Sequence, residues 1–440
     1  MSRAVARGPL GLAQKVGLSA LKKERLKRTL TALRGEILHR TGIEAFRAPA
    51  LRPASARTEG GEPPFMWRTA MIDGVAKAAA TDERRGRAVA HVLAAADAAL
   101  QGPDYSVVDK RLTPPGGDKH DYYTGGAYWW PAEGAPDGVP WTYRDGHMYP
   151  GRFGDDYDLT RLDDFAEAVK MLGLAYRYSG EPAYAARAAG LIRTWFLDPE
   201  RMMRPHLAWA QRIPGKRRIS GSGIIETLRF VYVIDAVGLI APSGALSEGE
   251  VDRLREWFVE YAHWMRVSSN GVMERATNNN HGLSWDIQQM SYALFTGDTA
   301  RARAVAEELP KRRVFRQIMP DGSLPEELRR KEAFFYIAYG IGFFFDTATL
   351  AENVGVDLWR YRTRGGAGVE PAVRDLLRYA DGGSPWRKGG TRVPGPELYA
   401  LALRGAWAYD DPGLAEVARR YEPDLPLQPV DWTVAPYPIR

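Results

Sequence analysis

The sequence has no cysteine, which excludes disulfide bonds, thiolate metal sites and cysteine nucleophiles. Its seven histidines are scattered, with no HxH or HxxxH spacing, so we expect no metal site. It also lacks a glycine-rich phosphate loop and any nucleotide-binding motif, so we expect no cofactor. No apolar run approaches the roughly 18 residues of a membrane span. Any chemistry must therefore come from polar and aromatic side chains.

Acidic residues are scarce only at the start of the chain. Residues 1–40 hold ten basic and two acidic residues, whereas the rest of the chain holds 50 basic and 52 acidic residues. Leu26, Leu30, Leu33 and Ile37 share one face of a predicted basic helix. We favour a helix that packs on the body over one that binds a membrane surface or nucleic acid. The segment lacks the apolar core of a secretory signal.

Most of the remaining chain is predicted to be helical. The helices come in pairs, joined by turns that contain Gly, Asp or Pro, residues suited to ending one helix and starting the next. The predicted hairpins pair residues 165–178 with 183–196, 291–295 with 299–309, and 396–409 with 413–421; longer apolar helices are predicted at 224–240, 247–267 and 331–354. Repeated helical hairpins without a clear strand predict an all-α fold, an incomplete (α/α) toroid or barrel.

Composition divides the chain into three predicted parts. Residues 1–62 form the basic helical arm and a linker rich in Pro, Ala, Arg and Gly. Residues 63–425 form the helical toroid, and a tail follows at residues 426–440. Within the toroid, residues 102–158 are non-helical and dense in Gly, Pro, Asp, Tyr and Trp. Because loops of this length are usually functional, we expect this aromatic-rich loop beside a cleft at the rim of the toroid.

Three asparagines lead directly into a histidine. Asparagine disfavours helix interiors and favours helix caps, so Asn278, Asn279 and Asn280 are predicted to end a loop before a helix at residues 283–295. His281 would then lie partly open at a helix start, where it titrates near neutral pH and backbone amides can hold an anion. The simpler alternative is a helix cap with an incidental surface histidine.

Arg329 and Tyr336 form a second candidate pair. They are seven residues apart, which on one helix corresponds to two turns, or about 10.5 Å along a shared face. A long arginine and a tyrosine at that spacing can converge on one ligand. The alternative is an arginine in a charged helix start and a core tyrosine whose hydroxyl is bonded internally.

Together these stretches resemble the alginate lyase superfamily of polysaccharide lyases. The matching blocks are YSVVDK at 105–110, GDKHDY at 117–122, YWWP at 128–131, AQ at 210–211, PG at 214–215, GIIET at 223–227, NNHG at 279–282, RQI at 316–318, DGS at 321–323 and RRKEAFFY at 329–336. They follow the family's order. The resemblance implies a toroid and a polysaccharide lyase that cleaves a uronic-acid-containing polymer, of the alginate, mannuronan or glucuronan type, by β-elimination.

Such an elimination has three requirements. A base takes the C5 proton, donors neutralise the uronate carboxylate, and the leaving C4 oxygen receives a proton. The resemblance assigns Asn280 and Arg329 to the carboxylate; His281 also fits that task, and Tyr336 fits proton transfer. Tyr336 serves as base only if positive charge from Arg329 and His281 lowers its pKa. If the C5 proton and the leaving oxygen share a face, Tyr336 can be both base and acid; otherwise His281 takes the proton.

The resemblance also implies that residues of the aromatic-rich loop and of two later blocks bind the sugars. The predicted substrate-binding residues are Lys119, His120, Tyr122, Tyr128, Trp129, Trp130, Gln211 and Glu226. Lys119 and His120 would meet uronate carboxylates, and the tryptophans would stack on sugar faces. The implied partner is an acidic polysaccharide, and no nucleic acid or cofactor is implied.

Departures from the family pattern leave the polymer open. Phe334 and Phe335 stand where relatives often have Trp-His, and the aromatic residues that follow Gly282 are shifted. Relatives are usually periplasmic or secreted, whereas no export signal is visible here, so a cytoplasmic location stays open.

Two other functions stay open beside the lyase. The first is a glycoside hydrolase on a similar toroid, which would need two carboxylates across a cleft, drawn from Asp118, Asp121, Glu226 and Asp286. The second is a non-catalytic carbohydrate-binding protein that retains the aromatic residues. An assay for an unsaturated product separates the lyase from both.

Overall fold

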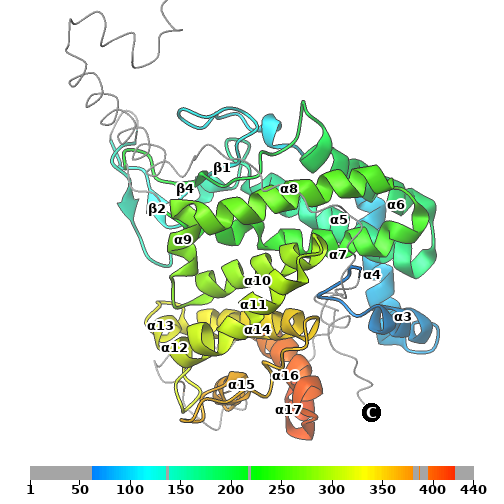
Figure 1. The fold of residues 1–440 in the computed structure, drawn as a ribbon, viewed down its shortest axis with the longest axis vertical. Coiled ribbons are helices and arrows are strands. Elements are labelled where there is room, and N and C mark those ends of the chain that lie inside the picture. The colour runs from blue at the N-terminus through cyan, green and yellow to red at the C-terminus, as the bar shows by residue number, and fades with distance from the viewer. Residues whose placement is uncertain (1–61, 135–137, 217–219, 380–385, 387–394, 422–440) are drawn as a thin grey trace, which may run out of the picture.

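The computed structural model describes residues 62–134, 138–216, 220–379, 386 and 395–421. Its ordered elements are mostly helices (Figure 1). The α-helices are α3 (Thr69–Ala78), α4 (Glu83–Leu100), α5 (Leu159–Ser179), α6 (Pro182–Ile192), α7 (Phe230–Ile240), α8 (Glu248–Val267), α9 (Ser269–Arg275), α10 (Asn280–Phe295), α11 (Thr299–Leu309), α12 (Phe315–Gln317), α13 (Pro325–Leu328), α14 (Ala333–Glu352), α15 (Val369–Leu377), α16 (Gly395–Tyr409) and α17 (Pro412–Arg420). The predicted basic arm and tail lie outside the described residues, apart from the last residue of the arm's linker.

The predicted helical hairpins are present, and their turns follow from their residues. α5 and α6 are joined at Gly180, whose φ of 72° is a left-handed conformation that glycine adopts without strain. Gly297, with a φ of 77°, has the same role between α10 and α11. Asp411 caps α17 by accepting hydrogen bonds from the amides of Gly413 and Leu414. Short turns of this kind place consecutive helices side by side.

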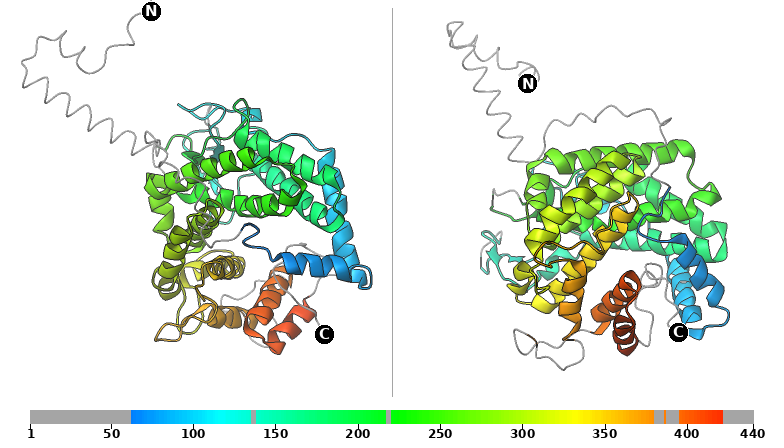
Figure 2. Two further views of the ribbon diagram at one scale, coloured as in Figure 1. Left: turned by 45° about the vertical axis from the view of Figure 1, so that its right-hand side comes forward. Right: turned by 60° about the horizontal axis from the view of Figure 1, so that its bottom comes forward.

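The helices form an open ring, which confirms the predicted incomplete toroid (Figure 2). α10 and α14 pack against each other. Residues 283–295 of α10 are all buried, as expected of a helix that is covered on every side. Among the described residues, α14 is the one helix long and apolar enough to cross a membrane, and 78% of its apolar window is buried in the fold.

The structure differs from the prediction in having four short strands. β1 (Tyr123–Gly125) pairs in parallel with β4 (Trp209–Arg212), and β2 (Trp129–Trp130) pairs antiparallel with β3 (Thr142–Tyr143). Strands of two to four residues are too short to show the alternation by which a sequence reveals a strand. β1, β2 and β4 lie together at one edge of the molecule, where they connect the aromatic-rich loop to the segment that precedes α7 (Figure 1).

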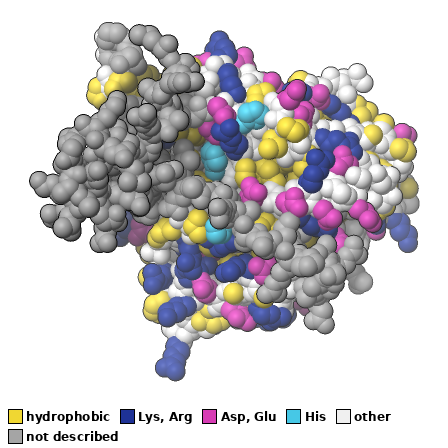
Figure 3. All heavy atoms as spheres, turned by 45° about the horizontal axis from the view of Figure 1, so that its top comes forward, with side chains coloured by type: hydrophobic (Ala, Val, Ile, Leu, Met, Phe, Trp, Pro, Cys, Tyr) yellow, Lys and Arg dark blue, Asp and Glu magenta, His cyan; other side chains and the backbone are white. Residues whose placement is uncertain are grey.

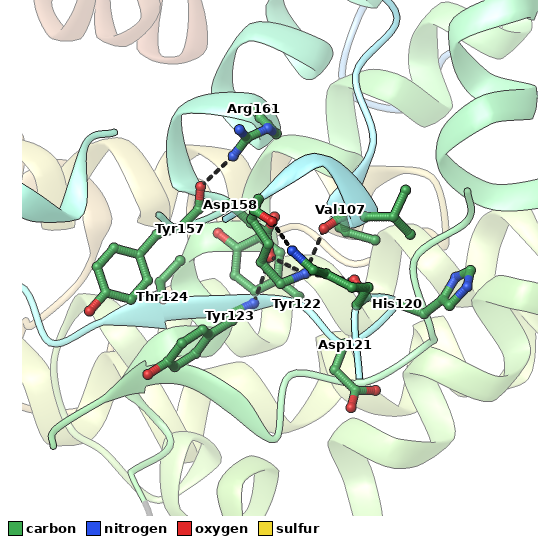
Figure 4. Close-up of polar contacts among 12 residues, drawn as sticks. Val107, His120, Asp121, Tyr122, Tyr123, Thr124, Tyr157, Asp158 and Arg161 are labelled. Atoms are coloured by element: carbon green, nitrogen blue, oxygen red, sulfur yellow. Dashed lines mark hydrogen bonds and ion pairs between the residues drawn. The ribbon is translucent and has the colours of Figure 1, made fainter. Parts of the chain in front are cut away.

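A buried ion pair fixes the base of the aromatic-rich loop. Lys110 and Asp158 are both fully buried, and Nζ and Oδ2 are 3.1 Å apart. Lys110 Nζ also donates to the carbonyl of Val107 at 2.6 Å, and Asp158 accepts from the amide of Tyr123 at 2.8 Å (Figure 4). Because an unpaired buried charge is costly, these bonds hold the two ends of the loop and β1 in one arrangement.

Candidate active site

The asparagine run ends a loop and starts α10, although the helix begins at Asn280, earlier than predicted. Asn279 is the N-cap, because its side-chain oxygen accepts from the amide of His281 at 3.2 Å. Gly282 has no room for a side chain, since a Cβ atom there would lie 2.4 Å from the carbonyl oxygen of Thr277. The cap and the lack of space at Gly282 together fix the position of His281 in the first turn of the helix.

Arg313 holds this turn from the core side. Its guanidinium and the carboxylate of Asp286 are fully buried and 2.5 Å apart. The guanidinium also donates to the carbonyls of Thr277 and Gly282, at 2.6 and 2.8 Å. Asp286 also pairs with Arg312 at 2.6 Å, so removal of Asp286 would leave the guanidinium of Arg313 buried without a charged partner. The turn is therefore fixed by charge as well as by its cap.

Glu274, on α9, orients the ring of His281. Its Oε1 is 2.7 Å from Nδ1; the side chain of Glu274 is 2% exposed and that of His281 is 23% exposed. Burial by itself would lower the pKa of His281, but Glu274 and the nearby Glu327 outweigh it, so the pKa lies above its ordinary value. Because Nδ1 is occupied, Nε2 is the ring nitrogen left to meet a ligand.

A second buried carboxylate holds Asn280. The backbone and side-chain nitrogens of Asn280 both donate to Oε1 of Glu327, at 2.9 and 3.1 Å. Both residues are 2% exposed, and burial raises the pKa of Glu327 in spite of these bonds. Glu327 belongs to α13, so this contact joins the start of α10 to the segment of the second candidate pair. The side-chain amide of Asn280 has a second N–H for another acceptor.

The predicted convergence of Arg329 with Tyr336 is not seen, because a break between α13 and α14 separates them. The side chain of Arg329 is 72% exposed and pairs with Glu326 at 2.5 Å. Arg330 instead lies over the ring of Tyr336, with its guanidinium carbon 3.7 Å from the ring centroid. The sequence analysis missed Arg330, since only the helix break distinguishes two adjacent arginines.

Tyr336 lies between Arg330 and Tyr128. Its hydroxyl shares a hydrogen bond with the hydroxyl of Tyr128, which follows β1 in the aromatic-rich loop. Burial raises the pKa of Tyr336, the Tyr128 hydroxyl raises it further, and Arg330 opposes both only in part. Arg330 thus lowers this pKa as a nearby positive charge should, but the net pKa still lies above the ordinary tyrosine value. In the free protein at neutral pH, the Tyr336 hydroxyl is protonated.

Arg330 connects the two halves of the site. Its positive charge acts on the pKa of both His281 and Tyr336, so the guanidinium lies within electrostatic reach of each. Three of the four predicted catalytic residues are thus linked through Glu327 and Arg330, and two further residues join them. We call the resulting set the reacting cluster, after the role proposed for it below. It consists of Asn280, His281, Arg330, Tyr336 and Tyr128.

The β2–β3 hairpin places further groups next to the reacting cluster. Arg330 lies 3.6 Å from Asp145, just beyond β3. Lys331 Nζ is 3.1 Å from His147 Nε2, and Lys216 Nζ is 3.6 Å from the ring centroid of Trp129. The three aromatic residues of the YWWP block are each partly exposed. Their predicted contact with sugars stays a prediction that this position favours.

Glu226 and Tyr122, which were both predicted to bind substrate, are buried in the core. Glu226 is 4% exposed and accepts hydrogen bonds from Tyr122 and Thr124, at 3.1 and 2.8 Å. Arg152 pairs with the same carboxylate at 2.6 Å, and Gln211 Nε2 donates to it at 3.0 Å. Tyr122 is fully buried. With its oxygens occupied, Glu226 joins the aromatic-rich loop to β4, and Gln211 is committed to it.

Lys119 and His120 are turned toward backbone carbonyls. Lys119 Nζ donates to the carbonyls of Lys110 and Arg111, and His120 Nδ1 is 2.7 Å from the carbonyl oxygen of Met202. Both side chains are partly exposed. In the described parts of the chain no contact joins them to the reacting cluster, so substrate contact by these two residues stays a prediction.

The carboxylates considered for a glycoside hydrolase are all paired. Asp286 and Glu226 are buried in the ion pairs described above. Asp118 and Asp121 both pair with Arg204. A hydrolase needs one carboxylic acid and one free carboxylate facing each other across the substrate. Three of the four side chains are buried and the fourth shares Arg204 with one of them, so the described residues give that alternative no support.

Comparison with known proteins identifies the family of the chain. The family model described as alginate lyase matches residues 106–386. The crystal structure of an alginate lyase from Bacteroides ovatus superposes with a TM-score of 0.79 at 32% identity, covering 85% of this chain and 100% of that one. A histidine-to-alanine variant of alginate lyase A1-III, complexed with a tetrasaccharide, gives a TM-score of 0.51 at 15% identity and covers 84% and 94%.

The last of these similarities supports the fold alone, since its identity is low. No curated protein matches the chain. The family model, however, spans well over half of the sequence and includes every residue of the reacting cluster. The chain therefore belongs to the alginate lyase family of polysaccharide lyases.

Proposed function

We propose that this polysaccharide lyase cleaves a 1,4-linked uronate polymer by β-elimination, with Tyr336 as the residue that moves protons. The observation that carries the proposal is the position of the Tyr336 hydroxyl, bonded to Tyr128 and beside the guanidinium of Arg330. A proton-transfer group next to preorganised donors is what elimination beside a carboxylate requires.

Three donors of the reacting cluster would bind the uronate carboxylate. Arg330 offers a planar fork that suits a carboxylate, Nε2 of His281 offers a second donor, and the side-chain amide of Asn280 offers a third. Arg330 takes the role that the sequence analysis gave to Arg329. These groups are fixed before substrate arrives, so they stabilise the enolate-like intermediate without waiting for water to reorient.

Tyr336 would then transfer the proton. Its hydroxyl is protonated in the free protein, so it is ready to donate to the C4 oxygen, while a role as base requires that it first lose its proton. Because burial raises the pKa of Tyr336, little of it is deprotonated at neutral pH. The rate of the base-dependent route therefore increases with pH.

An acidic polymer fits the local charge. Arg212, Lys216 and Lys331 have no acidic partner within salt-bridge distance in the described part of the chain, although Arg212 is half-buried on β4. On the face shown in Figure 3, charged side chains of both signs are interspersed. Unpaired cations next to the reacting cluster would attract the carboxylates of neighbouring sugars.

The polymer is tested by product formation. Mannuronan, guluronan, glucuronan and a panel of glycosaminoglycans would be incubated with the protein, and the unsaturated product would be followed by its far-ultraviolet absorbance. We expect absorbance to rise with a polyuronate and to stay flat with Tyr336→Phe. If the wild-type protein forms no unsaturated product from any of them, the proposal is wrong.

A further inference from the structure

We infer that a cavity at the far end of α14 from the reacting cluster is a second, non-catalytic site, which holds a uronate sugar of the same polymer. The inference rests on the proposed function for the identity of its ligand. The cavity has a volume of about 470 Å³, within the range of small-ligand sites. We call it the distal cavity. It is lined by Arg360, Arg362, Glu370, Trp407, Tyr409 and Asp410.

The length of α14 separates the distal cavity from the reacting cluster. Tyr336 lies in the first turn of α14 and Glu352 is its last residue, so about 24 Å of helix lies between them. Arg68 pairs with Glu352, and its guanidinium carbon lies 4.2 Å from the ring centroid of Trp407. Trp407 is therefore beside the far end of the helix. One sugar cannot reach both sites, whereas a polymer of several sugars can.

The end of α16 forms one wall of the distal cavity. The amide of Asp411 donates to the carbonyl of Ala406 at 3.0 Å, and Asp410 adopts a left-handed φ of 50°, a conformation that aspartate tolerates. This hydrogen-bonded turn carries Trp407, Tyr409 and Asp410 to the same side. The wall is thus formed without a ligand.

Arg360 is the cation of the distal cavity that is most available to a ligand. Its side chain is 80% exposed, and its ion pair with Asp357 is long, at 3.5 Å. Arg362, in contrast, pairs with Glu370, and Arg374 pairs with the other oxygen of that carboxylate at 2.8 Å. Exposed ion pairs contribute little to stability, so Arg360 can turn to an incoming carboxylate at small cost.

The other groups of the distal cavity suit a sugar ring. In the described residues Asp410 has no hydrogen-bond or ion-pair partner, so its carboxylate can accept from sugar hydroxyls. The Tyr409 hydroxyl oxygen is buried without a partner in the same part of the chain, and a ligand that reaches it would supply one. Trp407 is partly exposed and adds an apolar wall. A uronate carries both a carboxylate and hydroxyls on one ring, whereas a neutral sugar would leave Arg360 unused.

A second site on the same polymer would raise the efficiency of cleavage. Once one part of a chain is bound, the other part is held near the second site at a high effective concentration. The distal cavity would therefore retain a long chain while another part of it occupies the reacting cluster. Short oligomers, which cannot reach both places, would not gain from it.

Binding can be observed directly at Trp407. The full-length Tyr336→Phe protein, in which the ligand should persist, would be labelled at its tryptophans and titrated by NMR with oligomers of mannuronate, guluronate and glucuronate. Trp407→Phe would assign the indole signal. We expect this signal to shift saturably with at least one of the three oligomers. In Arg360→Ala the affinity obtained from the shift should fall at least about tenfold, as for the loss of one charge-assisted hydrogen bond.

Arg364→Ala is the matched control. Arg364 is a nearby exposed arginine that does not line the distal cavity, so its removal should change the affinity by less than about threefold. Neutral oligomers of glucose should leave the Trp407 signal in place. A signal that none of the three uronate oligomers moves would overturn the inference. So would equal binding of the neutral oligomer, or an affinity that Arg360→Ala leaves unchanged.

Cleavage gives the second readout. Arg360→Ala should lower kcat/KM for a long polyuronate at least about threefold more than kcat/KM for a short oligomer, because only the long chain reaches both sites. Equal losses on the two substrates would overturn the inference and leave the lyase function standing. If the wild-type protein cleaves no uronate polymer, the proposed function fails, while the Trp407 titration still decides whether the distal cavity binds a uronate.

Discussion

The turn in front of α10 and the β2–β3 hairpin contribute to the same site but are held in different ways. The turn is fixed from the core by the buried pair of Arg313 and Asp286 and by the buried Glu274. The hairpin is fixed by aromatic contacts and by weaker rim pairs, such as that of Asp145 with Arg330 at 3.6 Å. Buried charge pairs allow one arrangement only, whereas partly exposed contacts exchange readily with water.

The proposed function gives the turn and the hairpin different roles. Under the proposed function, the groups that act on the reacting atoms would come from the turn and from α14, and the groups that meet the variable parts of a polymer would come from the hairpin. Tyr336 contacts Tyr128, which precedes the hairpin, and Arg330, whose charge acts on His281 in the turn. Substitutions in the turn should therefore cost more than substitutions in the hairpin.

The largest effect is expected at Tyr336, which contacts both Arg330 and Tyr128. Tyr336→Phe removes only the hydroxyl, so kcat should fall by about 10²–10⁴-fold while substrate binding survives. Tyr339→Phe, one turn later on α14, is the matched control and should retain near wild-type turnover. Steady-state kinetics with binding measured by calorimetry would decide this, and near wild-type turnover for Tyr336→Phe would contradict the assignment.

Removing the support of the turn should destabilise the whole protein. Arg313→Met removes the fully buried partner of Asp286 and leaves that carboxylate with Arg312 alone, which should lower the free energy of unfolding by about 3 kcal/mol. Arg87→Met, which breaks the exposed pair with Glu83, should barely change it. Urea unfolding followed by circular dichroism measures both variants. Equal stabilities would show that the turn is no more firmly fixed than the surface.

Arg329 and Arg330 are adjacent in the sequence but differently placed in the structure, so their variants test which of the two acts in the site. Arg330→Ala removes the donor beside Tyr336 and should reduce kcat/KM by about 10²–10³-fold. Arg329→Ala removes an exposed side chain and should change kcat/KM by less than about fivefold. Arg330→Lys should fall between them, because lysine keeps the charge but loses the planar fork. The opposite ranking would restore the assignment made from spacing.

On the hairpin side, Tyr128→Phe should change the pH dependence more than the maximal rate. The Tyr128 hydroxyl raises the pKa of Tyr336, so its removal should lower that pKa and move the rise of activity to lower pH. The maximal kcat should change by less than about tenfold, as for a single neutral hydrogen bond. A pH–rate profile that does not move would show that Tyr128 does not act through Tyr336.

The smallest effect is expected at the rim. Asp145→Asn removes a partly exposed negative charge beside Arg330, so KM for an acidic polymer should fall, by less than about fivefold. The effect should fade as salt is added, because exposed charges are screened. KM measured at low and high ionic strength tests this. A larger, salt-independent effect would place Asp145 among the firmly fixed groups.

The sequence alone determined the features that depend on local patterns. The helical hairpins are encoded by apolar periodicity and turn residues, and the start of α10 is encoded by the cap preference of asparagine. The resemblance to the alginate lyase superfamily, whose blocks occur here in the family's order, singled out His281, Asn280 and Tyr336 as candidates.

Tertiary structure alone decided which neighbours act together. The break before α14 turns Arg329 outward and Arg330 inward, a difference that no spacing rule reveals. Glu274 and Glu226 look alike in the sequence, yet the first supports His281 and the second ties a loop to β4. The physical reason is that burial and long-range pairing, rather than residue type, set the charge and the partners of an ionisable group.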